Sequence, residues 1–305
     1  MTASAAFTHI NVCVCTFRRP ELLTRLLEAL EGQVTDDRFT FSVVIIDNDR
    51  AESARHAVNS FASRSNLAIE YGVEPEQNIA LARNRAIARA DGDFIALIDD
   101  DEFPAREWLL GMLRALRDYK AHGVLGPVKP HFEVRPASWV VRGGFCERPS
   151  YRTGTPLREA RQMRTGNCLI CRDVFLGEAG PFDPRFGRTG GEDVDFFSRR
   201  LTKGDPYVWC DEAAVFESVP PNRMTRIYFL RRALLRGVVN AHSVRILSLN
   251  SAKSLAAAII YTAMLPALLL WRHDVFMHYL IRDCDHIGKL FAICGVKLVH
   301  QRNAA

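Results

Sequence analysis

The feature that most constrains this chain is a series of short apolar runs that each end in polar or acidic residues, with helical segments between them. Residues 41–46 (Phe-Ser-Val-Val-Ile-Ile) lead into Asp47, and residues 94–98 lead into four consecutive acids. Runs of this kind are typical of strands that are covered on both faces. Strands that alternate with helices predict an α/β fold with a doubly wound, mostly parallel sheet.

The individual elements follow from the spacing of apolar residues. Five leucines between Leu22 and Leu30 fall on one helical face, with Pro20 at the first turn and Gly32 at the end, as helix ends favour. We expect an α/β domain over residues 1–240 and a helical extension over 241–305. Residues 142–164, rich in Gly and Arg, predict a loop over the site. The predicted strands are 9–15, 41–46, 67–73 and 94–98, and the predicted helices are 20–32, 51–61, 78–89 and 108–119.

Three predicted strands deliver polar side chains to one edge, and ligands in such sheets bind beyond the carboxyl ends of the strands. These strand ends are Thr16-Phe17-Arg18-Arg19, Asp47-Asn48-Asp49 and Asp99-Asp100-Asp101-Glu102. Adjacent carboxylates raise each other's pKa unless a cation neutralises them. A divalent Mg²⁺ or Mn²⁺ ion would remove the repulsion and could also hold a diphosphate. A solvated acidic turn that caps the next helix is the alternative, and the other strand ends favour the metal.

Other charged residues have both a structural and a functional interpretation. Asp47 is suited either to a hydrogen bond with a ribose or a base edge or to capping a helix. Arg83 is suited either to stabilising the charge of a phosphate or to an exposed helical face. Two glycines precede Glu192 and Asp193, which places these acids in the first turn of a helix, where the macrodipole stabilises them. The functional interpretation is that Asp193 accepts a proton from an acceptor hydroxyl.

In this order, the segments resemble the family 2, inverting glycosyltransferases of GT-A fold, over about residues 9–237. The likeness is to members that build bacterial exopolysaccharide or lipopolysaccharide, such as the succinoglycan glucosyltransferases. It is carried by Cys15-Thr16-Phe17-Arg18-Arg19-Pro20, Ile45-Ile46-Asp47-Asn48-Asp49, Ala82-Arg83-Asn84, Ile98-Asp99-Asp100-Asp101-Glu102, Thr165-Gly166-Asn167 and Gly190-Gly191-Glu192-Asp193.

The resemblance implies a UDP-sugar donor, a divalent ion (Mn or Mg) and Asp193 as the general base, with Glu192 beside it on the acceptor side. Many relatives supply a further metal contact through a His after the last core strand, where this chain has Glu217. We therefore expect the metal ligands to be Asp99, Asp101 and Glu217. The residues predicted to bind the nucleotide sugar are Thr16, Arg18, Asp47, Arg83, Asp99, Asp100 and Arg231.

The C-terminal part of the chain is basic. Between Ser218 and His273 there are eight Lys or Arg and no Asp or Glu, which leaves 32 basic residues against 35 acids elsewhere. Such a section suits nucleic acid, anionic lipid or a phosphorylated substrate. Residues 255–271 are almost wholly apolar but contain Pro266 and lie near the lower length limit for crossing a bilayer. An interfacial helix, a core helix and a membrane span all remain open.

We expect a cytoplasmic protein that is peripheral on the inner face of the plasma membrane, with a glycan or polyprenyl-diphosphate-linked acceptor and no nucleic acid. Residues 1–9 lack the basic head and apolar stretch of a secretory signal, so the eight cysteines should be reduced. Cys168 and Cys171 have redox or zinc spacing, but no second pair lies at a matching distance, which favours structural thiols.

Two other function classes are weaker. A sugar-1-phosphate nucleotidyltransferase would need a Gly-rich phosphate loop after the first strand, and residues 15–20 contain no glycine. A nucleic-acid-binding module would use the basic section and would show steep salt dependence without needing a divalent metal. The processive synthases carry Gln-x-x-Arg-Trp where this chain has Arg231-Arg232-Ala233-Leu234-Leu235-Arg236-Gly237, which favours one sugar per encounter.

Overall fold

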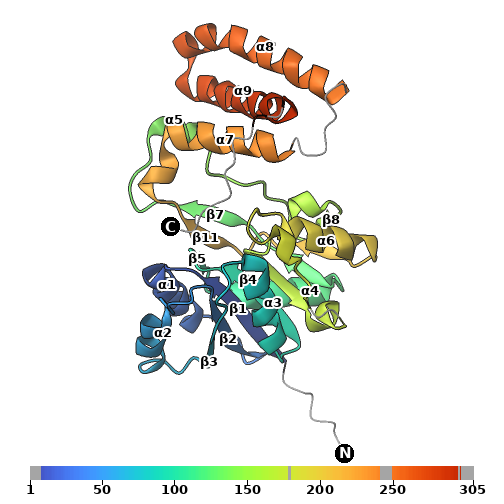
Figure 1. Cartoon of the computed structure of the whole chain (residues 1–305). Helices are drawn as coiled ribbons and strands as arrows, with labels where there is room; N and C mark the ends of the chain where they lie inside the picture. The colour runs from blue at the N-terminus through green and yellow to red at the C-terminus, as the bar shows by residue number, and fades with distance from the viewer. Residues whose placement is uncertain (1–7, 178–179, 241–248, 295, 297–305) are drawn as a thin grey trace, which may run out of the picture. The chain divides into compact units, whose positions relative to one another are not determined.

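The computed structural model describes residues 8–177, 180–240, 249–294 and 296, which belong to two compact units (Figure 1). The first unit contains Met1–Lys129 and Arg148–Ser218, and the second contains Pro130–Glu147 and Val219–Ala305. The division between these units does not coincide with the boundary expected at residue 240, because the segment after Ser218 groups with the C-terminal helices.

The first unit is built on an eight-stranded sheet in the order β3-β2-β1-β4-β9-β6-β10-β8. The first four strands along the chain pair in parallel, as predicted: β1 (His9–Thr16), β2 (Thr40–Asp47), β3 (Ile69–Val73) and β4 (Phe94–Asp99). The rest of the sheet consists of β6 (Gly123–Leu125), β8 (Pro156–Leu157), β9 (Asn167–Cys171) and β10 (Tyr207–Trp209).

Helices cover both faces of this sheet (Figure 1), which confirms the doubly wound arrangement. Because side chains alternate across a strand, Val12 and Val14 face one core while Cys13 faces the other. The first core is closed by α1 (Pro20–Glu31), α2 (Arg55–Ala62) and α4 (Trp108–Asp118), and the second by α3 (Ile79–Arg89) and α6 (Glu192–Thr202).

Strand β9 was not predicted and lies antiparallel between β4 and β6. It contains Cys168 and Cys171, both of which are free thiols. Residues three apart in a strand point to opposite faces of the sheet, so these two thiols do not face a common ligand. The two cysteines are therefore structural thiols of β9, and their spacing does not form a zinc or redox pair.

A second, three-stranded sheet has the order β5-β11-β7, formed by β5 (Glu102–Pro104), β11 (Val215–Ser218) and β7 (Val128–His131). Strand β5 is antiparallel to β11 and pairs Glu102 with Glu217. The predicted loop over 142–164 contains β8, the 3-10 turn η1 (Ala160–Gln162) and the last residue of α5. Two further 3-10 turns are η2 (Arg172–Phe175) and η3 (Pro184–Phe186).

The second unit is helical, and its three long helices pack in layers with α9 in contact with both α7 and α8 (Figure 1). Two glycines allow α7 and α9 to approach closely. A Cβ added at Gly288 would lie 2.1 Å from the backbone oxygen of Leu234, and one added at Gly237 would lie 2.1 Å from that of Asp285. This tight packing explains why α7 groups with the C-terminal helices. The helices are α5 (Ser138–Arg142), η4 (Pro221–Met224), α7 (Arg226–Asn240), α8 (Leu249–Trp271) and α9 (His273–Ile293).

Gly288→Ala is expected to destabilise the second unit by about 1–3 kcal/mol, because the added methyl group meets a backbone oxygen that no side-chain rotation can move away. Gly111→Ala in α4 is the matched control, since its Cβ would lie 3.7 Å from the nearest side chain and alanine gains up to about 1 kcal/mol over glycine in a helix. Urea unfolding, combined with limited proteolysis of the second unit, measures both variants. Equal stability of Gly288→Ala and the parent would contradict the packing argument.

Candidate active site

Three strand ends meet at one edge of the large sheet, as the sequence predicts. Thr16 is the register partner of Asp47 on β2, and Cys15 is the partner of Asp99 on β4. The backbone N–H of Asn48 donates to the oxygen of Thr16 at 2.8 Å, so the β1 and β2 ends stay together beyond the last strand pair. The polar rim is therefore formed by neighbouring strands.

The β1 end contacts the acidic run after β4 directly. The Thr16 hydroxyl donates to Oδ2 of Asp100 at 2.8 Å, and Nη1 of Arg19 lies 3.0 Å from both Oδ1 of Asp100 and Oδ2 of Asp101. Burial raises the pKa of Asp100 above its ordinary value. Burial, followed by the negative charge of Asp99, raises the pKa of Asp101 to about 6. These carboxylates thus lie in a poorly solvated, strongly negative part of the rim.

Arg83, on α3, bridges the two acidic clusters. Its Nη1 lies 2.5 Å from Oε1 of Glu192, and its Nη2 lies 3.2 Å from Oδ1 of Asp99. Arg83 and Glu192 are both buried, so the guanidinium is surrounded by carboxylates rather than exposed on a helical face. Although burial disfavours its charge, these two carboxylates hold the pKa of Arg83 above its ordinary value. The bridge joins the end of β4 to the first turn of α6.

Arg83→Met is expected to lower the free energy of unfolding by about 3–5 kcal/mol, because it leaves the buried Glu192 carboxylate without its partner. The second change in Arg83→Met/Glu192→Gln removes that charge and should restore part of the loss. Chemical denaturation of the single and double variants measures the coupling. Additive effects of the two substitutions would show that the bridge contributes little.

Asp193 lies beside Glu192 at the start of α6, which follows Gly190 (φ 85°) and Gly191 (φ 104°). The positive φ values favour glycine at both positions and turn the chain into the helix. Nη1 of Arg164 lies 3.4 Å from Oδ2 of Asp193, whose side chain is only partly exposed. Asp195, in the same helical turn, pairs instead with Arg199 at 3.0 Å.

Asp47 is fully buried and its carboxylate already accepts three hydrogen bonds. The donors are the N–H groups of Asp49 (3.0 Å) and Ala54 (2.8 Å) and the hydroxyl of Tyr71 (2.9 Å). Ala54 directly precedes α2, so Asp47 helps to organise the start of that helix, as the cap interpretation expects. Arg18 is exposed nearby, and its Nε lies 3.0 Å from Oδ2 of Asp49.

The three predicted metal ligands are each paired with an arginine. Asp99 contacts Arg83, Asp101 contacts Arg19, and Glu217 forms an ion pair with Arg148. Within the part of the chain that the structure describes, no three Asp, Glu, His or Cys side chains converge closely enough to hold a metal ion as they stand.

The chemistry of the rim nevertheless fits a hard divalent cation. All donors are carboxylate oxygens, which Mg²⁺ and Mn²⁺ prefer. Gly166 leaves space beside them, since an added Cβ would lie 2.9 Å from Oε1 of Glu102 and 3.0 Å from Oδ2 of Asp99. Burial, and then the charge of Asp99, raises the pKa of Glu102 well above its ordinary value, and a cation would relieve this repulsion.

Several residues at the rim were not predicted as site residues. Arg19, Arg148 and Arg164 each contact a predicted carboxylate, and Gly166 lies against two of the acids. The Cys15–Pro20 and Thr165–Asn167 motifs pointed to Arg19 and Gly166, and the predicted loop over 142–164 contains Arg148 and Arg164 without singling them out. Arg231 lies on α7 of the second unit, where its side chain is exposed, and its part in the site stays a prediction.

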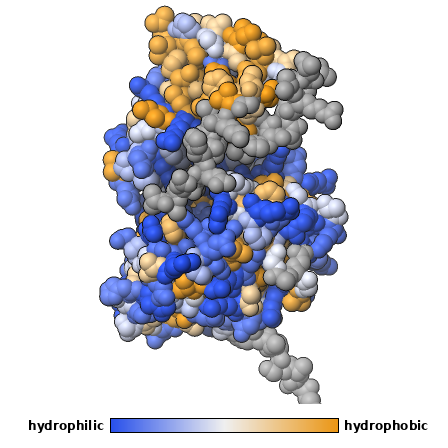
Figure 2. Space-filling model, in the orientation of Figure 1, coloured by the Kyte–Doolittle hydropathy of each residue, from blue (hydrophilic) through white to orange (hydrophobic). Residues whose placement is uncertain are grey.

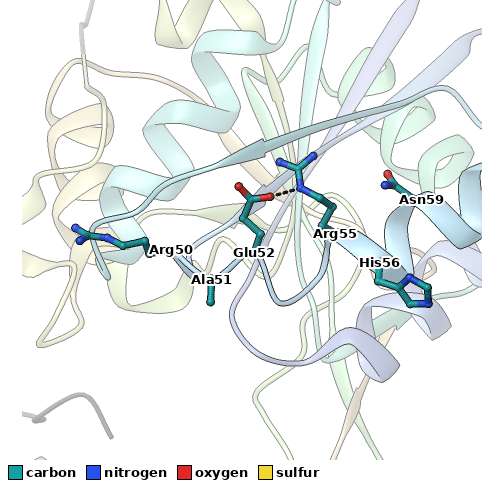
Figure 3. A pocket seen from close by; sticks show the side chains of 6 residues that line it. All are labelled: Arg50, Ala51, Glu52, Arg55, His56 and Asn59. Carbon is teal, nitrogen blue, oxygen red and sulfur yellow. Dashed lines mark hydrogen bonds and ion pairs between the residues drawn. The ribbon is translucent and has the colours of Figure 1, made fainter.

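A surface pocket of about 510 Å³ lies in the first unit beside the β2 end of this rim, where the N–H of Ala51 donates to Oδ1 of Asp49 at 3.2 Å (Figure 3). Its lining comes from the turn after β2 and from α2, and two of the lining residues, Glu52 and Arg55, form an ion pair (Figure 3). None of the predicted site residues line this pocket, so it does not alter the assignment of the site. The lining residues are Arg50, Ala51, Glu52, Arg55, His56 and Asn59.

Comparison with known proteins adds independent information. The profile of the family described as "Glycosyl transferase family 2" matches residues 11–176. The chain is similar to the "Succinoglycan biosynthesis protein ExoM" of Rhizobium meliloti (strain 1021), with 31% identity over 97% of this chain and 96% of that protein.

Two solved structures share the GT-A fold. The mannosyltransferase PcManGT from Pyrobaculum calidifontis, in complex with GDP-Man and Mn²⁺, has a TM-score of 0.61 and 19% identity, and the match covers 92% of this chain and 87% of that one. S. aureus TarS 1-349 in complex with UDP-GlcNAc has a TM-score of 0.54 and 14% identity, over 94% and 91% of the two chains.

Proposed function

Because the chain belongs to glycosyl transferase family 2 and is therefore a glycosyltransferase, we propose that it moves a sugar from a UDP-sugar donor to a hydroxyl of a glycan or lipid-linked acceptor. The transfer would invert the anomeric configuration, and the product would enter a bacterial cell-surface polysaccharide. Membership of the family argues against the two rival classes, the nucleotidyltransferase and the nucleic-acid-binding module.

One observation carries the proposal: Arg83 bridges Asp99 at the end of β4 and Glu192 at the start of α6. This contact brings the strand ends predicted to bind the donor next to the helix that begins with Glu192 and Asp193. A direct displacement needs a donor site and a base on either side of the anomeric carbon, held at a fixed separation. The bridge provides such a connection.

In the proposed reaction, a carboxylate oxygen of Asp193 accepts the proton of the acceptor hydroxyl. The acceptor oxygen forms a bond to the anomeric carbon while the bond from that carbon to the diphosphate oxygen breaks. The electron pair of the broken bond leaves with UDP. A carboxylate is basic enough, because the hydroxyl proton becomes acidic as the new bond forms.

The nucleotide sugar would be bound by the side chains along the rim. Asp99, Asp101 and Glu217 would hold a divalent ion, which when bound neutralises the diphosphate and makes UDP a better leaving group. We propose that Arg19 and Arg148, which pair with Asp101 and Glu217, would then contact phosphate oxygens, and that Arg83 would contribute its charge while it keeps Glu192. Thr16, Arg18, Asp47, Asp100 and Arg231 are proposed to complete the nucleotide and diphosphate contacts.

A lipid-linked acceptor fits the C-terminal helix α8. Residues Ser251–Trp271 form one helix that is long and apolar enough to cross a membrane. We propose that the protein works at the cytoplasmic face of the plasma membrane as a peripheral protein, where a polyprenyl-diphosphate-linked acceptor would be accessible. Transfer of one sugar per encounter would suit the stepwise assembly of a repeating unit.

A panel of nucleotide sugars, tested for hydrolysis and for thermal stabilisation with and without Mn²⁺, tests the donor assignment. A UDP-sugar is expected to stabilise the protein and to be hydrolysed only when the ion is present. Stabilisation by GDP-mannose with no response to any UDP-sugar would overturn the choice of uridine. No response to any nucleotide sugar would overturn the proposed donor class.

A further inference from the structure

The outer side of α8 is exposed and apolar. The side of α8 that faces α9 carries buried small and apolar residues, among them Ser254, Ala258 and Leu268. On the opposite side, Leu270 is 90% exposed and Trp271 is 71% exposed. Figure 2 shows this surface as the orange region over α8. We define the outer α8 face by Leu255, Ile259, Ile260, Met264, Leu270 and Trp271.

The charges around this face fit a lipid surface with anionic headgroups. Lys253 and Arg272 are exposed at the two ends of α8, and the sequence from Ser218 to His273 contains no acid. Asp274 follows but is buried, and its Oδ2 lies 2.6 Å from Nη2 of Arg272. Basic and aromatic side chains at the ends of an apolar helix are typical of helices that interact with a membrane, both those that lie at the interface and those that cross it.

The length of α8 alone would allow it to cross a bilayer. Its 23 residues span about 35 Å at about 1.5 Å per residue, which exceeds a hydrocarbon core of about 30 Å. A crossing helix, however, must carry with it whatever is packed along its length.

α9 is packed along α8 and is too polar to enter the hydrocarbon. Arg272 is the only residue between the two helices, and halfway along them the hydroxyl of Thr262 donates to Oδ2 of Asp283 at 2.9 Å. α9 also carries Asp285 and Lys289, which pair at 2.8 Å, and it packs on α7 through Gly288. Moving these charged groups into the bilayer core would be costly.

We infer that α8 lies in the plane of the membrane surface and does not cross it. Its outer face would enter the boundary between headgroups and acyl chains along its whole length, while α9 stays on the aqueous side between α8 and α7. The partner is a lipid bilayer that contains anionic lipid. This inference deepens, and rests on, the membrane attachment in the proposed function.

Co-sedimentation of the full chain with vesicles tests the surface. The protein is expected to bind vesicles of phosphatidylcholine mixed with phosphatidylglycerol more tightly than vesicles of phosphatidylcholine alone. Ile259→Glu/Leu270→Glu should weaken binding by at least about tenfold, because it places two charges on the outer α8 face, which would enter the membrane. Ile227→Glu is the matched control, since Ile227 is 77% exposed but lies on α7, and it should bind normally.

Depth-dependent quenching distinguishes the in-plane helix from a span. Ala256→Trp and Ala263→Trp, each in a Trp271→Phe background, are compared with the native Trp271, using lipids brominated near the headgroup or near the bilayer centre. An in-plane helix gives the same shallow depth at all three positions, whereas a span places residue 263 much deeper than residue 271.

Three outcomes would overturn the inference: no vesicle binding, a deep residue 263, or a dimer in solution that Ile259→Glu/Leu270→Glu separates. The last outcome would identify a second copy of the chain as the partner of this face. Vesicle binding without any response to nucleotide sugars would sink the proposed donor chemistry and leave the docking surface standing.

Discussion

Asp193→Asn is expected to lower kcat for sugar transfer by about 10²–10⁴-fold, the range that a positioned general base contributes. Asparagine keeps the size of the side chain and can still accept a hydrogen bond from Arg164, which lies 3.4 Å from Asp193 in the parent. It cannot take the proton of the acceptor hydroxyl at neutral pH. The Kd of UDP should therefore stay within about twofold of the parent, because the interaction lost belongs to the transition state.

Asp195→Asn is the matched control for this experiment. Asp195 lies in the same first turn of α6 but pairs with Arg199, so its replacement should leave kcat near the parent value. Steady-state kinetics with a defined acceptor, together with calorimetric titration of UDP, separate chemistry from binding. An Asp193→Asn variant that keeps most of its transfer rate would exclude this carboxylate as the base.

Asp101→Ala is expected to weaken Mn²⁺-dependent binding of the donor by at least about 10–100-fold, the loss that is usual for groups that only support a metal ligand. In the absence of the ion, the two proteins should bind UDP almost equally. Arg19 keeps its second carboxylate, Asp100, at 3.0 Å after the substitution, so its contact with phosphate should change little in the metal-free titration.

Asp36→Ala controls for the loss of an arginine-paired aspartate. Asp36 pairs with Arg114 at 3.0 Å, and both side chains are exposed. Titrations of UDP with and without Mn²⁺ should give parent-like values for this variant. If Asp101→Ala retained the full effect of Mn²⁺ on UDP affinity, the ion would have to be held by other residues.

The parallel part of the fold could be predicted because its signals are local. The runs that end at Asp47 and Asp99 are apolar throughout, and the leucine spacing after Pro20 fits only a helix. The start of α2 was expected at residue 51 but lies at Arg55, because Glu52 adopts a positive φ of 56° and its N–H donates to the oxygen of Asp49 in a turn. A single unusual backbone conformation of this kind leaves little trace in the sequence.

The composition of the rim could be predicted, but its ion pairs could not. The carboxylates follow directly from the strand ends, since adjacent parallel strands finish at the same edge. The arginines that pair with them come from α3 (Arg83), from a loop (Arg148) and from the turn between β1 and α1 (Arg19). An arginine on a helix usually faces water, and only the packing of α3 against the sheet shows that Arg83 is buried.

The central position of β9 has a consequence for how the nascent chain folds. β9 separates β4 from β6 and pairs with both, so before residues 167–171 leave the ribosome these two strands each present an unpaired edge. Unpaired edges are prone to aggregation. The sheet between β4 and β6 can therefore be completed only in the second half of synthesis. Fragments that end before Asn167 should need a chaperone or become insoluble.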